Sequence, residues 1–211
     1  MNHRLVIIGG GPSIKGFDFN LLNQQFSFGL NFACHFYNPT ALLWVDRDFY
    51  PQNKQHIDNK DCIKITKNNC DVPKDFFRLK AVKSYHGLDS LSQGVYTPYL
   101  VGLFALTIGV ALKFEEIYLL GYDCRFLNNN SHFHDIEHRG KKNEQPYLKG
   151  TRHFDVYKDC QSKIFNVSLD SALHVFPKIS YSEFCKRLPL YSIQQQTAKE
   201  WLKSQLMIHT V

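Results

Sequence analysis

The sequence lacks the short motifs that would assign it at once to a redox, zinc-binding or membrane class. None of its six cysteines forms a Cys-x-x-Cys pair, which favours a reduced protein with buried thiols. The longest apolar run, 99–112, is interrupted by glycine and threonine and is too short to span a membrane. The apolar run at 5–8 is too short for a signal peptide, so we expect a cytoplasmic protein without a membrane span.

The composition is that of a globular protein with a moderate excess of positive charge. Hydrophobic residues make up 44% of the 211 residues and charged residues 21%. We expect one domain at 1–190 and a tail helix at 191–211. The net charge of +6 suits phosphate-bearing ligands. It permits nucleic acid as a partner but does not favour it, because the one basic cluster, 139–142, is short and typical of a solvated loop.

Short apolar runs alternate with segments of helical pattern along the chain. This alternation predicts an α/β fold of Rossmann type, a mostly parallel sheet with helices on both faces. The polar segment 125–150 predicts a small lid. The tail helix carries Trp201, which indicates either a homo-oligomer contact or docking on the domain. The expected strands are 4–8, 26–31, 41–45, 62–66, 117–121 and 165–167, and the expected helices are 96–113, 151–163, 180–186 and 197–207.

The first strand runs directly into Gly9-Gly10-Gly11-Pro12-Ser13. Glycines let a ligand approach the backbone closely, and free N–H groups at the start of a helical turn bind anions. The motif is not a Walker loop, because no Gly-Lys-Ser/Thr follows, and Ile14 replaces the third glycine of the dinucleotide fingerprint. The turn therefore predicts a nucleotide-phosphate site, with a ligand-free strand–helix turn as the alternative.

Other polar residues follow expected strands or open expected helices, where ligands of parallel sheets bind. Asn31, Asp46, Gly94 and Asp123 are of this kind. Asp46 suits a ribose hydroxyl or a phosphate-bound metal, or it is a solvated acid. Asp123 suits a metal, or it caps nearby N–H groups, the interpretation we favour.

Histidines are concentrated in and after the expected lid. His132, His134, Asp135 and His138 could bind zinc, although their spacing fits no known zinc motif. His153 follows Arg152 at an expected helix start, where a histidine can serve as a general base beside a phosphate-binding arginine. The alternative for His153 is an exposed histidine without a catalytic role.

Two parts of the sequence resemble the Campylobacter-type bacterial sialyltransferases. The resemblance is carried by 9–15 and by the block from 93–96 to 115–123, which ends in Glu-Ile-Tyr-Leu-Leu-Gly-Tyr-Asp. The same skeleton is similar to the MptE-like Rossmann proteins, which include 6-hydroxymethylpterin diphosphokinases, and 165–171 also looks like that group. Two departures are Gly10 and Asp46, which stand where the sialyltransferases have asparagines.

The resemblance implies a glycosyltransferase that moves an acidic, sialic-acid-like sugar from a CMP-linked donor to the hydroxyl of a glycan or another acceptor. His153 would be the base, and Tyr147 and Arg152 would stabilise the departing phosphate. His153 and Tyr147 match the family's histidine and tyrosine by region only. The nucleotide would contact Gly9, Gly10, Gly11, Pro12, Ser13, Asn31, Asp46, Ser92, Gln93 and Gly94.

Two other functions remain open on the sequence. One is an ATP-dependent pyrophosphokinase of MptE-like type, with Mg²⁺ held by Asp46 or Asp123. The other is a nucleotide- or nucleic-acid-binding module without turnover. A metal requirement separates the first from a glycosyltransferase, and salt-sensitive binding to DNA or RNA would indicate the second.

Overall fold

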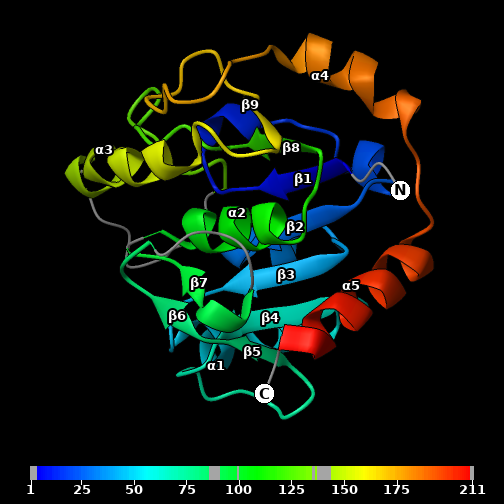
Figure 1. Cartoon of the computed structure of the whole chain (residues 1–211). Helices are drawn as coiled ribbons and strands as arrows, with labels where there is room; N and C mark the ends of the chain where they lie inside the picture. The colour runs from blue at the N-terminus through cyan, green and yellow to red at the C-terminus, as the bar shows by residue number, and fades with distance from the viewer. Residues whose placement is uncertain (1–3, 86–90, 99, 135, 137–143, 210–211) are drawn as a thin grey trace.

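The computed structural model describes residues 4–85, 91–98, 100–134, 136 and 144–209. Its centre is a seven-stranded sheet in which every strand pair is parallel, as Figure 1 shows. The strands, in the order in which they lie across the sheet, are β5 (Phe77–Leu79), β4 (Ile63–Lys67), β3 (Ala41–Trp44), β2 (Ser27–Leu30), β1 (Arg4–Ile8), β8 (Glu116–Leu120) and β9 (Lys163–Asn166). The predicted α/β fold with a parallel sheet is confirmed.

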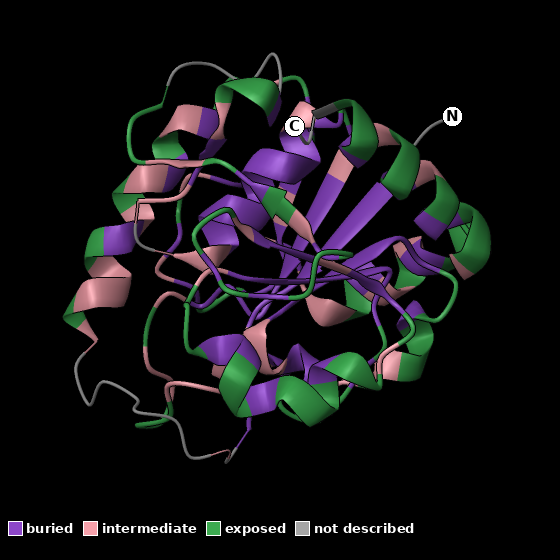
Figure 2. Ribbon diagram, turned by 90° about the horizontal axis from the view of Figure 1, so that it is seen from below, coloured by how far each residue is buried: buried purple, intermediate pink, exposed green. Residues whose placement is uncertain are grey.

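Both faces of the sheet are covered, and the alternation of side chains along each strand decides which residues face which layer. On β1, Leu5 and Ile7 pack toward α2 (Val101–Ala111) and α5 (Gln195–His209), which lie on one face. Val6 and Ile8 pack toward the layer that contains α4 (Tyr181–Arg187). Farther along the same face, α1 (Phe49–Asp58) covers β3. Figure 2 shows the buried strands enclosed by these helices.

Several expected helices differ in the structure. The helix expected at 96–113 begins at Val101, because β7 (Val95–Tyr96) first pairs with β6 (Ala81–Val82) in a separate ribbon. Thr151 does not begin a helix. It ends α3 (Gln145–Thr151), where its hydroxyl donates to the carbonyl of Leu148, and the 3₁₀ helix η5 (Arg152–Tyr157) follows.

Other segments were missed or only partly predicted. Helix α1 was not predicted, and the segment after the glycine turn forms two 3₁₀ turns, η1 (Pro12–Ile14) and η2 (Phe19–Leu22). The remaining 3₁₀ turns are η3 (Asn31–His35), η4 (Leu91–Gln93) and η6 (Leu188–Leu190). The tail helix α5 docks on the sheet through Ala198, Leu202 and Leu206, which are fully buried. No helix in the described part of the chain has the length and apolar character needed to cross a membrane.

The order of the strands creates one crevice at the carboxyl edge of the sheet. From β1 the chain adds β2 to β5 on one side, and it then returns to place β8 on the other side of β1. Ile8 of β1 lies level with Leu120 of β8, so the segments that follow these two parallel strands begin side by side at the same edge of the sheet. Such a switch point is where open α/β sheets bind ligands.

Candidate functional site

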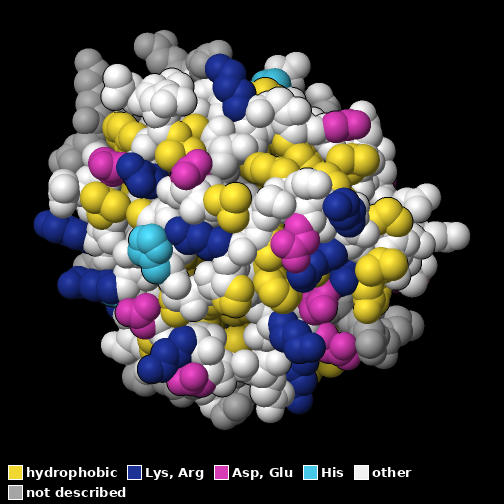
Figure 3. Space-filling view, turned by 90° about the horizontal axis from the view of Figure 1, so that it is seen from above, with side chains coloured by type: hydrophobic (Ala, Val, Ile, Leu, Met, Phe, Trp, Pro, Cys, Tyr) yellow, Lys and Arg dark blue, Asp and Glu magenta, His cyan; other side chains and the backbone are white. Residues whose placement is uncertain are grey.

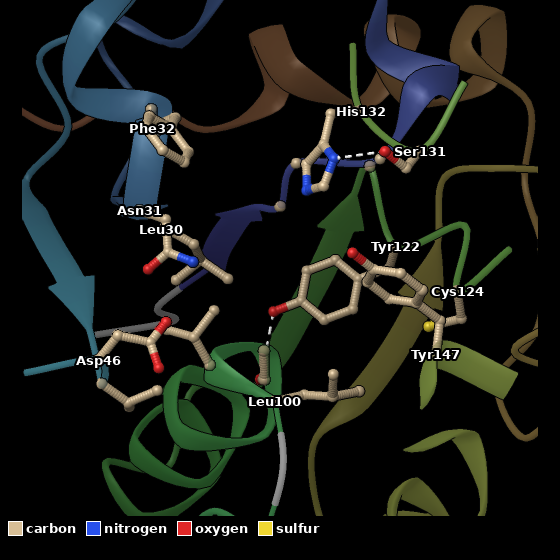
Figure 4. Close-up of a pocket in the computed structure, with 18 of the residues that line it drawn as sticks. Leu30, Asn31, Phe32, Asp46, Leu100, Tyr122, Cys124, Ser131, His132 and Tyr147 are labelled. Carbon is tan, nitrogen blue, oxygen red and sulfur yellow. Dashed lines mark hydrogen bonds between the residues drawn. The ribbon is translucent and has the colours of Figure 1, made fainter. Parts of the chain in front are cut away.

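A cleft of about 1470 Å³ opens at this switch point. Its floor contains the glycine backbone of Gly9, Gly10 and Gly11 and the buried ring of Tyr122. Figure 4 shows Asn31 and Asp46 on one side of the cleft and Tyr147 on the other, with His132 between them. The cleft exceeds the range of about 300–1,000 Å³ that is typical of a pocket for one small ligand.

The glycine turn is tied to the end of β8 by its own backbone. The N–H groups of Gly9 and Gly11 donate to the carbonyls of Leu120 and Gly121, at 2.7 and 2.9 Å. A Cβ placed on Gly11 would lie 2.5 Å from the Gly121 oxygen, so glycine is required for this close approach. The sequence predicted free N–H groups here, but at Gly9 and Gly11 they already have protein acceptors.

Asp123, which follows β8, also holds the glycine turn against the end of that strand. It is 1% exposed, and its carboxylate accepts from the N–H of Ser13 at 2.9 Å and from the hydroxyl of Ser168 at 2.6 Å. It therefore caps the turn, as the favoured interpretation of the sequence expected. Pro12, Ser13 and Asp123 lie outside the residues that line the cleft.

Asn31 presents a buried amide to the cleft. It follows β2 directly and has a left-handed backbone with φ 48°, which asparagine adopts more readily than most residues other than glycine. Its Oδ1 is buried without a hydrogen-bond partner among the described residues. A buried acceptor without a partner is costly, so a ligand donor at this point would relieve the cost. Asp46, after β3, lines the same side with its exposed carboxylate.

Positive charge lies on the wall formed by α3 and its neighbours. We call Arg125, Lys149 and Arg152 the cationic wall. All three are exposed and line the cleft. Tyr147 lies among them, and burial raises the pKa of its phenol, so it stays a neutral hydrogen-bonding group. The sequence placed Tyr147 and Arg152 at a phosphate, and the structure brings both to this wall.

One part of the expected lid, residues 131–134, lies over the glycine turn. Residues 131–134, which we call the cover segment, are held there by the N–H of Phe133, which donates to the carbonyl of Gly10 at 3.1 Å. His132 and His134 both line the cleft, with ring centroids 5.3 Å apart. Asp135, His138 and the basic cluster 139–142 lie outside the described residues. Within the described residues, no three metal-ligating side chains come together.

His153 lies beside the cleft and does not line it. Its Nδ1 is 2.8 Å from the Tyr96 hydroxyl, while its neighbours Arg152 and Phe154 both line the cleft. Burial and the positive charge of Arg152 lower the pKa of His153 below its ordinary value of 6.5. The imidazole is therefore neutral at pH 7, as a general base requires.

Ser92, Gln93 and Gly94 also lie outside the cleft-lining residues. They belong to η4 and the turn into β7, where Gly94 has φ 114° and packs against Val82. The structure therefore does not bring these three residues together with the glycine turn, Asn31 and Asp46.

Sequence reasoning missed several cleft residues, above all the rings of Phe32, His35 and His56 and the cations Arg125 and Lys149. Phe32 and His35 follow the second strand directly, so the rule that ligands bind beyond strand ends would have found them. His56 lies on the helix that was not predicted and had no signal of its own.

No family model matches this chain, and the search of curated proteins found no relative. Among solved structures, the fold is similar to the sialyltransferase CstII from Campylobacter jejuni in complex with cytidine-5'-monophosphate, at 17% identity over 84% of this chain and 85% of that chain, with a TM-score of 0.49. It is also similar to the monofunctional alpha-2,3-sialyltransferase Cst-I from the same organism, at 16% identity over 83% and 80% of the two chains, with a TM-score of 0.49. At these identities and TM-scores the likenesses do not decide what this chain does.

Proposed function

We propose that this protein is a glycosyltransferase-like enzyme that transfers a sugar from a nucleotide donor to an acceptor hydroxyl. The observation that carries the proposal is the division of one cleft into two chemically distinct ends. Asn31 and Asp46 supply oxygen acceptors at one end, and the cationic wall supplies positive charge at the other. A nucleotide has the complementary pattern, with donor groups on its base and ribose and negative charge on its phosphate.

The glycine turn supplies the surface between these ends. Gly9, Gly10 and Gly11 all line the cleft, so the ligand can contact their backbone beside the cover segment. Because the buried Asp123 carboxylate lies beneath the turn, an anion is stabilised better at the cationic wall than at Ser13. We therefore place the phosphate at Arg125, Lys149 and Arg152, with Tyr147 as a neutral donor.

The transfer step needs a base for the acceptor hydroxyl. The acceptor oxygen bonds to the anomeric carbon as the bond from that carbon to the phosphate oxygen breaks, and the electron pair leaves with the nucleotide phosphate. The hydroxyl proton passes to a histidine. His132 lines the cleft over Gly10. His153 lies beside the cleft, and its lowered pKa keeps its imidazole neutral. These two histidines are the candidates for the base.

Binding of free nucleotides tests the donor half of the proposal. Thermal unfolding should be measured with CMP, CDP, UDP, GDP and ATP, each with and without Mg²⁺. A nucleotide at a hundredfold excess over its Kd should add about 2.7 kcal/mol to the free energy of unfolding. We expect CMP to give the largest shift, on the resemblance of the glycine turn and the Gln93 to Asp123 block to the sialyltransferases. If no nucleotide stabilises the protein, the proposal is wrong.

The cationic wall provides a matched pair of variants. A double variant, Lys149→Gln with Arg152→Gln, should weaken nucleotide binding about tenfold or more, because charge-assisted bonds to phosphate are lost. Lys158→Gln removes an exposed cation of the next turn, outside the cleft, and should leave nucleotide affinity unchanged. Equal losses in both proteins would indicate a general effect of net charge.

A second candidate, ATP-dependent pyrophosphoryl transfer, is favoured by Asp46 and Asp48, which both line the cleft and could hold Mg²⁺. Asp123 is buried, and its carboxylate already accepts hydrogen bonds from the protein, so it is not placed to bind a metal with Asp46 and Asp48. Stabilisation by ATP that requires Mg²⁺ and is lost in Asp46→Asn would put this candidate ahead. On the face drawn in Figure 3, the Lys and Arg side chains of the described residues alternate with Asp and Glu, so these residues form no continuous basic surface for nucleic acid there.

A further inference from the structure

Five ring side chains that line the cleft form a continuous strip, and the proposed nucleotide site does not use them as a group. We call them the ring strip. All five line the cleft, and Figure 4 shows two of them, Phe32 beside Asn31 and His132 beside Ser131. The ring strip consists of His56, His35, Phe32, His134 and His132.

The rings follow one another at contact distance although they come from three different segments. His56 of α1 stacks on His35 of η3 with centroids 3.7 Å apart, and His35 lies 5.7 Å from Phe32. Phe32 lies 5.0 Å from His134 of the cover segment. His134 in turn lies 5.3 Å from His132, which is above the glycine turn. The strip therefore leads from the outer rim of the cleft to its floor.

The ring strip is not simply part of the hydrophobic core. Only His134 is buried, whereas Phe32, His35 and His132 are half-buried and His56 is exposed, so most of the strip borders the cleft. Four of the five rings are imidazoles, which core packing does not require. His35 Nε2 is 2.8 Å from Asn53 Oδ1, so hydrogen-bonding groups lie directly beside the ring faces.

Ring faces interleaved with imidazole nitrogens and amides suit a ligand with apolar faces and polar edges. The faces of aromatic rings carry partial negative charge and attract the C–H groups of a sugar ring. The sugar's hydroxyls can then bond to imidazoles and amides at the edge of the strip. The strip contains no Lys or Arg, unlike the cationic wall, so it suits a neutral ligand better than a phosphate.

The size of the cleft allows both ligands to bind at once. Its volume of about 1470 Å³ exceeds a typical single-ligand pocket, and the cationic wall and ring strip occupy different parts of its lining. We propose that the ring strip is the acceptor subsite and binds a neutral oligosaccharide, with the reacting hydroxyl at the His132 end. This inference rests on the proposed function for the donor and adds the chemical class and position of the acceptor.

Binding of sugars without a nucleotide tests the strip directly. The full-length protein should be titrated with neutral oligosaccharides of increasing length, with calorimetric detection. A separate titration with oligothymidine tests the alternative that the rings bind the bases of single-stranded nucleic acid. A double variant, Phe32→Leu with His56→Ala, removes two rings and keeps an apolar side chain at the half-buried position. We expect oligosaccharide affinity to fall about tenfold or more in this variant, while CMP affinity stays within about twofold.

The matched control makes the same chemical changes away from the cleft. Phe165→Leu with His174→Ala replaces a partly buried phenylalanine of β9 and an exposed histidine, and it should bind oligosaccharides like the wild type. Melting curves of both double variants show whether each is folded.

The outcomes separate this inference from the proposed function. The inference is wrong if no oligosaccharide binds, if the strip variant binds as well as the control, or if oligothymidine binds more tightly than every oligosaccharide. If CMP binds the wild type and oligosaccharides do not, the donor site stands and the acceptor assignment fails. If oligosaccharide binding depends on the strip but no nucleotide binds, the strip is a sugar site and the proposed transferase function fails.

Discussion

The N–H of Ser13 donates a hydrogen bond of 2.9 Å to Oδ2 of Asp123, and this bond joins the first turn of the chain to the end of β8. The Asp123 carboxylate is 1% exposed and also accepts from the Ser168 hydroxyl. Asp123→Ala leaves two buried donors without their acceptor, so we expect a loss of about 3 kcal/mol in the free energy of unfolding.

Chemical denaturation of Asp123→Ala measures this loss. Asp159→Ala is the control, because the side chain of Asp159 is 85% exposed, and its substitution should change stability by less than about 0.5 kcal/mol. Similar denaturation midpoints for the two variants would contradict the role of Asp123 as the buried link between the turn after β1 and the end of β8.

The glycines of the first turn should differ sharply in their tolerance of alanine. A Cβ on Gly11 would lie 2.3 Å from Oδ2 of Asp123 and 2.5 Å from the backbone oxygen of Gly121, neither of which can easily move. We expect Gly11→Ala to cost about 3 kcal/mol of stability or to prevent folding.

Gly10→Ala is the matched comparison for Gly11→Ala. The nearest atom to its Cβ, at 2.9 Å, is Cδ2 of the His132 side chain in the cover segment. The ring can turn aside, so the melting temperature should stay close to that of the wild type while nucleotide binding weakens. Equal destabilisation by the two alanines would show that the turn itself, rather than its contact with β8, requires glycine.

Stability should depend on pH through His153. Burial and Arg152 lower its pKa in the folded protein below 6.5, so the unfolded chain binds the proton more readily. The folded state therefore has its full stability above pH 6.5, and this contribution is lost as the pH falls from 6.5 toward the lower pKa of the folded state. His153→Asn should lose less stability than the wild type between pH 7.5 and 5.5, measured by thermal melting in the two buffers.

His174→Asn is the control for this experiment, because His174 is exposed. It should melt with the pH dependence of the wild type. If His153→Asn and the wild type lose the same stability on acidification, burial does not disfavour the charged form of His153.

Turnover of CMP-linked sugar should distinguish the two candidate bases. The His132 ring lines the cleft over Gly10, whereas Nδ1 of His153 is engaged with the Tyr96 hydroxyl. Removing the base should lower kcat by about 10²–10⁴-fold and leave nucleotide affinity nearly unchanged. We expect this loss in His132→Ala if the base is in the cleft, and in His153→Ala if the sialyltransferase-like assignment holds.

A parallel His134→Ala variant tests the other histidine of the cover segment. If none of the three substitutions changes turnover, the base is not one of these three histidines.

The sequence by itself determined the class of the fold. Apolar runs such as Leu5-Val6-Ile7-Ile8 are long enough only for strands buried on both faces, and their alternation with helices predicts a parallel sheet. The positions of Gly9, Asn31 and Asp46 after such runs also placed them at one edge of the sheet. This information is local, because each residue is located by the strand that precedes it.

Only the tertiary structure decided which of these groups face a ligand. The amides of Gly9 and Gly11 meet acceptors on β8, which lies more than a hundred residues away in the chain, so no local pattern could show that they are occupied. Helix α3 ends at Thr151 instead of a helix beginning there, and the His153 ring lies against the Tyr96 hydroxyl. The ring strip joins His56, Phe32 and His132 from three segments, because long-range packing of the cover segment on η3, rather than spacing along the chain, brings their rings together.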